Sequence, residues 1–243
     1  MPALRVLWLA LVSLYDETTA LVTGNLLWIA LNLPVFLVVV VVGLPFADIG
    51  SQAWVWWLVG LAWLLLVLPT PGGIALGALA KEAAGPDVPR RQAFWDGLRA
   101  RWRLGLGCAG ASLLITVAVV FNIVFYATHT DGPVRLVSII WVYALWFWLG
   151  MHVYLVPLIH HVQQPRFLDL YRRAALITLG QAGQTLALVL LLLVLGVLSI
   201  IFLPAYVLVG AAYVALAQAH ALREVRRRVG DLPHVEPDPG VKL

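Results

Sequence analysis

His152 is the side chain best placed for proton chemistry, because it titrates near neutral pH and lies well inside a long apolar run. Ionisable groups at membrane depth are functional candidates by default. A proton relay needs a second titratable group, however, and no Asp or Glu stands at a comparable depth. We therefore favour the alternative interpretation, in which a neutral imidazole bonds to a neighbouring backbone carbonyl.

Asparagine side chains are further strongly polar groups within the apolar runs, at Asn25, Asn32 and Asn122. Amides in an apolar environment need hydrogen-bond partners, which usually lie on other helices. Asn25 and Asn32 are seven residues apart, so they share one helix face. That spacing suits either a polar pocket or a packing seam, and we favour the seam. With His152, these three residues form the candidate polar site.

No motif in the chain is typical of an enzyme, a metal site or a cofactor site. The sequence has no nucleophile elbow, phosphate loop, H-E-x-x-H motif or paired carboxylates within its apolar runs. His160 and His161 are adjacent, but neighbouring helical residues point about 100° apart. No Cys, Asp or Glu stands at ligand spacing from them, so a solvated interfacial pair is the favoured interpretation. We expect no catalytic residue, metal or cofactor.

A helix break is predicted inside the apolar run 52–80, at Pro69, Pro71, Gly72 and Gly73. One interpretation is a helix broken at membrane depth, whose freed backbone groups line a polar site. The other is that the helix ends near Leu68 at the cytoplasmic interface and a short second helix begins there. We favour the second interpretation.

Apolar runs of membrane-spanning length must position all of these residues. The chain is 62% hydrophobic and 12% charged, with a mean hydropathy of +0.93, unlike a soluble domain. A bilayer core about 30 Å thick needs roughly 20 apolar residues per helix. Six runs without Asp, Glu, Lys or Arg reach or approach that length: 20–46, 52–80, 104–127, 136–159, 182–202 and 206–221.

These runs predict an all-α, polytopic transmembrane bundle of about six spans, with residues 1–228 as a single transmembrane domain. The tail, 229–243, holds three prolines and little apolar surface, so we expect it to be disordered.

Basic residues are sorted to one side of this predicted bundle. Of 16 Lys and Arg residues, all except Arg135 fall in the N-terminal segment or in 81–103, 160–181 and 223–243. Cytoplasmic loops of membrane proteins carry an excess of Lys and Arg, so both termini are predicted to be cytoplasmic. The expected partner of these cations is the lipid bilayer, because no basic domain or stacking platform for nucleic acid stands outside the apolar runs.

An internal repeat with an offset of 73 residues predicts cytoplasmic surface helices. In each copy the pattern leads into an apolar helix, with Asp three residues before Arg on one face and with small residues that permit close helix approach. An N-terminal helix over 4–15 would form a third, more divergent unit. The matching pairs are Phe94 and Phe167, Asp96 and Asp169, Arg99 and Arg172, Gly107 and Gly180, and Gly110 and Gly183. The charged pairs Asp96, Arg99, Asp169 and Arg172 are the candidate partner or lipid surface.

The run Asn25, Leu26, Leu27, Trp28, followed by Leu33 and Pro34, resembles the YesL-like family of bacterial membrane proteins, a domain family of unknown function. Pro71, Gly72, Gly73, Ala75 and Ala78, and then the segment 94–103, resemble later parts of its pattern. The chain departs from that pattern by a long insertion between Pro34 and Pro71. The resemblance implies a bacterial inner membrane protein associated with carbohydrate uptake, and it carries over no catalytic or binding residues.

The expected function is a non-enzymatic accessory or partner-binding component, beside a sugar transporter component or as a homo-oligomer. The alternative is a small-solute permease, in which the broken second helix, Asn25, Asn32 and His152 converge on one cavity. An enzyme is the third interpretation. A continuous polar cavity lined by these residues would favour the permease, whereas a dry bundle would favour the accessory component.

Overall fold

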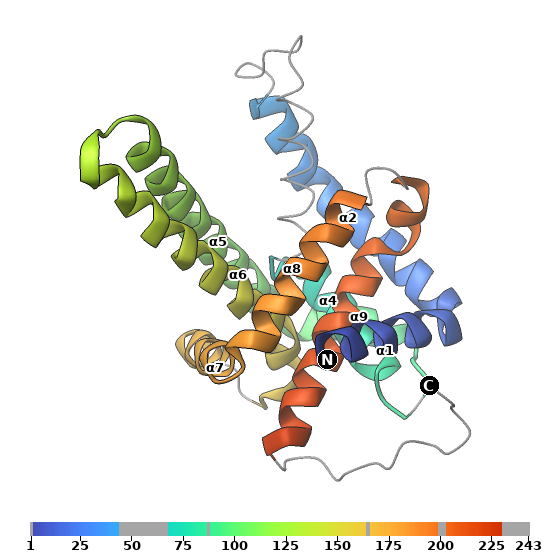
Figure 1. The fold of residues 1–243 in the computed structure, drawn as a ribbon. Coiled ribbons are helices and arrows are strands. Elements are labelled where there is room, and N and C mark those ends of the chain that lie inside the picture. Colours follow the sequence, from blue (N-terminus) through green and yellow to red (C-terminus); the bar gives the residue numbers. More distant parts are fainter. Residues whose placement is uncertain (1, 44–67, 87, 164–165, 199–202, 230–243) are drawn as a thin grey trace.

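The computed structural model describes residues 2–43, 68–86, 88–163, 166–198 and 203–229, and these residues form an all-α structure (Figure 1). The predicted all-α class is therefore confirmed. In chain order the elements are α1 (Pro2–Asp16), α2 (Thr18–Gly43), α4 (Pro71–Ala83), α5 (Gln92–Thr128), the 3-10 helix η2 (Gly132–Leu136), α6 (Val137–His161), α7 (Phe167–Gly180), α8 (Ala182–Leu198) and α9 (Leu203–Val229).

Helix α4 lies at the centre of the bundle, where α2, α5, α6 and α9 all pack against it (Figure 1). Its small residues allow this crowding. A Cβ atom at Gly77 would lie 2.6 Å from Cγ1 of Val156 in α6, and one at Gly72 would lie 2.6 Å from the amide nitrogen of Asn32 in α2. Such distances leave no room for a side chain. The pair Gly73 and Gly77 predicts a close helix contact, and Gly77 makes one.

Residues 68–70, directly before α4, are not helical, and residues 52–67 of the predicted second span lie outside the described residues. Thr70 caps the helix, because its Oγ1 accepts a hydrogen bond of 3.0 Å from the N–H of Gly73. Pro71 occupies the first turn, where its missing N–H costs nothing. A Cβ atom at Gly105 of α5 would lie 3.5 Å from Cα of Pro71. The break is therefore level with the start of the apolar run 104–127, and not with its middle.

Two pairs of helices turn through nearly a right angle, α1 with α2 by 100° and α7 with α8 by 99°. Helices α1 and α7 therefore lie across the helices that follow them, as expected for helices on a membrane surface. Each buries one face against the bundle and exposes apolar residues on the other. The exposed residues are Leu4, Trp8, Leu11 and Tyr15 in α1, and Leu168, Leu176 and Leu179 in α7.

The first copy of the repeat does not form the surface helix that the sequence predicts. Residues 92–128 form one continuous helix, α5, so a separate surface helix before the run 104–127 is wrong. The reason is the contact with α4, which holds α5 straight on both sides of the expected bend. A Cβ atom at Gly97 would collide with Cβ of Ala78, and one at Gly105 would lie 2.7 Å from Cδ1 of Ile74.

Two helices of the described residues are long and apolar enough to cross a membrane, Gln92–Thr128 and Gly132–His161, and up to four are if each bent pair counts as one span. The described helices therefore support two to four spans, and the predicted number of about six stays a prediction. Helix α4 has 13 residues and is about 20 Å long, too short for a bilayer core of about 30 Å. Residues 52–67 of the predicted second span and the predicted disordered tail from 230 onward lie outside the described residues.

Helices α5 and α6 form a hairpin that projects from the rest of the bundle (Figure 1). Gly132, with a φ of 62°, reverses the chain between them in the left-handed region that glycine adopts readily. Large apolar side chains are exposed on both helices of the hairpin, Leu114 (74%), Phe121 (64%), Ile140 (66%) and Tyr143 (73%) among them. So much apolar exposure is expected of a surface that faces lipid.

Candidate polar network and basic cavity

Asn25 and Asn32 are both buried along α2, at 1% and 5% exposure. The Oδ1 atom of Asn25 accepts a hydrogen bond of 3.0 Å from the backbone N–H of Ala212 in α9. The Nδ2 atom of Asn32 donates a bond of 2.8 Å to the carbonyl of Trp28 and faces Gly72 of α4. Both amides therefore lie where α2 meets other helices, which supports the packing seam.

His152 is fully buried in α6 and bonds through both ring nitrogens. Its Nδ1 lies 2.8 Å from the carbonyl of Trp148, and its Nε2 lies 2.8 Å from Oγ of Ser112 in α5. A carbonyl can only accept, so Nδ1 carries the proton and Nε2 accepts from the serine hydroxyl. This is the neutral imidazole with a carbonyl partner that the sequence favours.

Ser112 extends this contact into a network between α5, α6 and α7. Because the serine proton goes to His152, the Oγ of Ser112 accepts a bond of 2.7 Å from the hydroxyl of Tyr171 in α7, and that hydroxyl oxygen lies 3.1 Å from the carbonyl of Cys108. One turn along α5, Thr116 accepts a bond of 3.0 Å from the indole N–H of Trp148. Ser112, Thr116 and Tyr171 are not among the site residues predicted from the sequence, although the i, i+4 spacing of Ser112 and Thr116 marks one polar face of α5.

The contact between Ser112 and His152 resembles a nucleophile with its base, but the geometry does not support catalysis. In that arrangement a third group, usually a carboxylate, orients the histidine. Here the Nδ1 atom bonds to a backbone carbonyl, and Ser112 and His152 are 0% and 1% exposed. A substrate has no access to either atom, so the network fixes the packing of three helices.

Among the hydrogen bonds between described residues, none joins one residue of the candidate polar site to another. Asn122 lies far along the projecting part of α5 and donates a bond of 2.7 Å to the carbonyl of Ala118 in its own helix. Asn25 and Asn32 bond within the contacts of α2, whereas His152 bonds between α5 and α6. Each side chain has its own separate partner, as expected for packing.

Basic side chains bond the carbonyls at the C-terminal end of α6. Lys81 donates a bond of 2.8 Å to the carbonyl of His160, and Arg101 donates to the carbonyls of Ile159 and Val162. Cations stabilise this end of a helix because the unpaired carbonyls and the helix dipole carry partial negative charge. These contacts join α4, α5 and α6 at one end of the bundle, which we call the basic end.

His160 and His161 are also engaged at this end. The Nε2 atom of His160 lies 2.8 Å from the carbonyl of Ile74 in α4, and the Nδ1 atom of His161 lies 2.8 Å from the carbonyl of Pro157. The predicted solvated pair is therefore wrong, because each ring bonds to a different backbone carbonyl. The two rings do not form a shared ligand set, and no group of three or more His, Cys, Asp or Glu in the described ranges could hold a metal.

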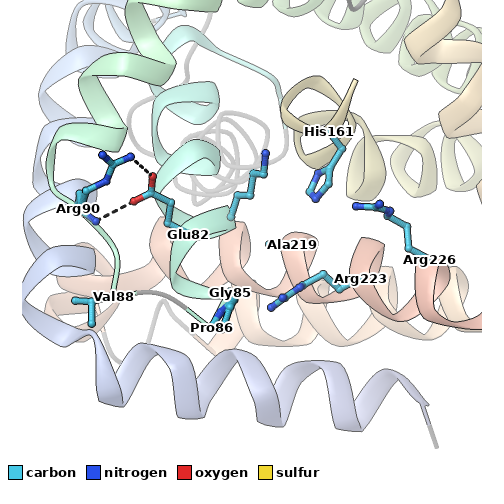
Figure 2. A pocket seen from close by; sticks show the side chains of 10 residues that line it. Glu82, Gly85, Pro86, Val88, Arg90, His161, Ala219, Arg223 and Arg226 are labelled. Carbon is cyan, nitrogen blue, oxygen red and sulfur yellow. Dashed lines mark hydrogen bonds and ion pairs between the residues drawn. The ribbon is translucent and has the colours of Figure 1, made fainter. Parts of the chain in front are cut away.

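A cavity of about 460 Å³ opens at the basic end between α4, the chain after it, α6 and α9 (Figure 2). Among the described residues that line it, Glu82 is the one with a carboxylate. Arg90 forms an ion pair of 3.1 Å with that carboxylate, and the backbone N–H of Arg90 donates to it a hydrogen bond of 2.9 Å. Figure 2 shows His161 and Arg226 directed into the same space, with this ion pair on its other side. The charged and polar side chains that line it are Lys81, Glu82, Arg90, His161, Arg223 and Arg226.

The cations of this cavity perturb one another. Partial burial, and then the charges of Arg101 and Arg226, lower the pKa of Lys81 below its ordinary value. Burial and the charge of Arg226 lower the pKa of Arg223 in the same direction. The described lining holds an excess of positive charge, because it contains Lys81, Arg90, Arg223 and Arg226 and the single carboxylate of Glu82.

A second hollow of about 620 Å³ lies along α5, between Gln163 and the segment 99–104. It contains the half-exposed indole of Trp102, and the guanidinium of Arg103 stacks over that ring at 5.4 Å from its centroid. Trp beside Arg is typical of a membrane interface. Asp96, Arg99, Asp169 and Arg172, which the repeat singles out, are all exposed, and neither Asp–Arg pair forms an ion pair in the described structure.

No family model, curated protein or solved structure matches this chain. The resemblance to the YesL-like family therefore stays a prediction that rests on short motifs, chiefly those of residues 25–34. The hydropathy and lengths of the helices indicate an integral membrane helical protein.

Proposed function

We propose that this chain is a non-enzymatic accessory component of a bacterial inner membrane, with about six spans and both termini in the cytoplasm, which binds a partner protein through the two copies of its repeat. The exposure of the repeat residues carries this proposal. Asp96, Arg99, Asp169 and Arg172 are all exposed although they recur at matching positions. Because neither Asp–Arg pair forms an ion pair in the described structure, these charged side chains are available to another molecule.

The glycines of the repeat give the same indication. A Cβ atom at Gly107, Gly110, Gly180 or Gly183 would meet nothing within 4 Å. Among the described residues these glycines thus make no close approach to another helix, contrary to the expectation that they serve the hairpins of this chain. In a bilayer, small residues on an exposed helix face favour contact with a helix of another chain.

The association with carbohydrate uptake is a further part of the proposal, and it rests on the resemblance alone. A permease is the weaker alternative, because it requires Asn25, Asn32 and His152 to line one cavity. Their hydrogen bonds to separate partners favour packing instead. The position of the break at Pro71, level with the start of the apolar run of α5, likewise favours a helix that ends at the interface.

Purification in a mild detergent, followed by identification of co-eluting proteins, tests the accessory function. We expect a membrane transport component to co-elute with the wild type, and its recovery to fall in the double variant Arg99→Gln with Arg172→Gln. The double variant Arg91→Gln with Arg173→Gln is the matched control, because it removes two exposed arginines that the repeat does not pair.

Two results would overturn the proposal. Equal recovery of the partner with both double variants would remove the functional meaning of the repeat. Recovery of no partner, together with uptake of a sugar by vesicles that contain only this protein, would establish the permease in its place.

A further inference from the structure

Arg223 is the residue of the basic cavity with the clearest unmet need for a partner. It is half-buried in α9, and among the described residues no carbonyl or carboxylate accepts a hydrogen bond from its guanidinium. The nearby Glu224 is taken by other arginines, with an ion pair of 2.7 Å to Arg227 and one of 3.1 Å to Arg228. A half-buried guanidinium without an acceptor leaves five donors available to a ligand.

The cavity gathers further positive charge around Arg223. Lys81 lines the cavity from α4. Arg226 reaches it from the next turn of α9, and His161 adds a ring from α6 (Figure 2). Glu82 cannot balance these cations, because Arg90 already holds both of its carboxylate oxygens. The cationic donors come from α4 and α9, two elements far apart in sequence, which distinguishes the cavity from a solvated row of charges on one helix.

The size and the donors of the cavity fit a phosphate group. Small-molecule sites in proteins have volumes of roughly 300–1,000 Å³, and this cavity has about 460 Å³. Arginine forks match the oxygens of a phosphate in pairs, and lysine adds a compact charge. Basic pockets near the interface also bind the headgroups of anionic lipids.

We propose that the cavity lined by Lys81, His161, Arg223 and Arg226 binds a phosphate group, supplied either by a phospholipid headgroup or by a soluble phosphate ester. Neither the partner protein nor the repeat surface enters this inference. The bound phosphate would neutralise the cations that now repel one another, so its binding stabilises the basic end. It would also fix α4, α6 and α9 relative to each other.

Thermal denaturation of the full chain in a maltoside detergent, followed by tryptophan fluorescence, tests the site. We expect a saturable rise in melting temperature with sodium phosphate or with added phosphatidylglycerol, beyond that produced by sodium chloride of equal ionic strength. A response to phosphate alone identifies a soluble ligand, and a response to phosphatidylglycerol but not phosphate identifies a headgroup. Failure of both to stabilise the wild type would overturn the proposal.

Variants locate the ligand within the cavity. Arg223→Gln should weaken binding by about tenfold or more, the loss expected for a charge-assisted hydrogen bond. Arg227→Gln is the matched control, because Arg227 lies in the same helix but pairs with Glu224 and does not line the cavity. Equal weakening in the two variants would mean that the ligand binds a diffuse basic surface, and would contradict the proposal.

A purely structural role for Arg223 predicts a different result. If Arg223 serves only ligand binding, Arg223→Gln should not lower the melting temperature without ligand, because it relieves repulsion from Arg226. Arg223→Lys, which keeps the charge, should retain part of the binding. A lower melting temperature in both variants without ligand, with no change in affinity for either phosphate source, would assign Arg223 to the fold and refute the site.

Discussion

Replacing Gly97 by alanine tests the central position of α4, because α5 and α4 make their closest contact there. A Cβ atom at Gly97 would overlap Cβ of Ala78, and Cα of Ala75 lies 3.7 Å away. Neither atom belongs to a flexible side chain, so one of the two helices must shift. Gly107 offers a matched control, since it lies in the same helix and a Cβ there would meet nothing within 4 Å.

The magnitude follows from two opposing effects. Alanine favours a helix over glycine by about 1 kcal/mol, and this gain is common to both variants. Overpacking at a tight contact costs about 1–3 kcal/mol, and only Gly97→Ala incurs it. We therefore expect Gly107→Ala to be neutral or up to about 1 kcal/mol more stable than the wild type, and Gly97→Ala to be about 1–3 kcal/mol less stable than Gly107→Ala.

The assay is thermal denaturation of both variants in the same detergent, monitored by tryptophan fluorescence and by the monodisperse fraction in size exclusion. Comparing two variants of one helix removes the influence of the detergent on the absolute values. If Gly97→Ala melts at the same temperature as Gly107→Ala, or above it, then α4 does not pack against α5 as described.

Further predictions concern the buried network and the pH response. Ser112→Ala and His152→Gln should each lower the unfolding free energy by about 1–3 kcal/mol, and the double variant should lose less than their sum, because they remove the same bond; additive losses in chemical denaturation would disprove the contact. The folded pKa of Lys81 lies below its unfolded value, so the unfolded chain binds more protons between these two pKa values and stability should rise with pH across that range. The melting temperature of the wild type, relative to that of Lys81→Gln, should therefore rise with pH across that range. A relative melting temperature that stays flat or falls would contradict the burial of Lys81 beside other cations.

The helical class and the apolar runs could be predicted from the sequence, because long runs without charge have few other solutions in a membrane. The spacing of Asn25 and Asn32 placed both on one helix face but left a pocket and a packing seam open, and their hydrogen bonds favour the seam. The straight course of α5 could not, since the repeat alone predicts the same bend in both copies. Only the contact with α4, made through Gly97 and Gly105, explains why one copy stays straight and the other turns by 99°.

The network around Ser112 and the basic cavity depend on contacts between distant parts of the chain. Ser112 meets His152 forty residues away and Tyr171 fifty-nine residues away, and Lys81 and Arg223 line the same cavity only because α4 packs on α9. Serine and tyrosine carry no periodic signal that identifies such partners. Positive charge was predicted for this end of the molecule, but its convergence on one cavity requires the tertiary structure.

The account depends most on the bundle crossing a membrane with its basic end in the cytoplasm. The measurement that tests this most directly is labelling of single cysteines in intact cells by a membrane-impermeant maleimide, in a Cys108→Ser background. We predict that Asp131→Cys, at the turn between α5 and α6, is labelled from outside, and that Arg227→Cys is labelled only after the membrane is permeabilised. Labelling of Arg227→Cys in intact cells, with Asp131→Cys protected, would contradict the account.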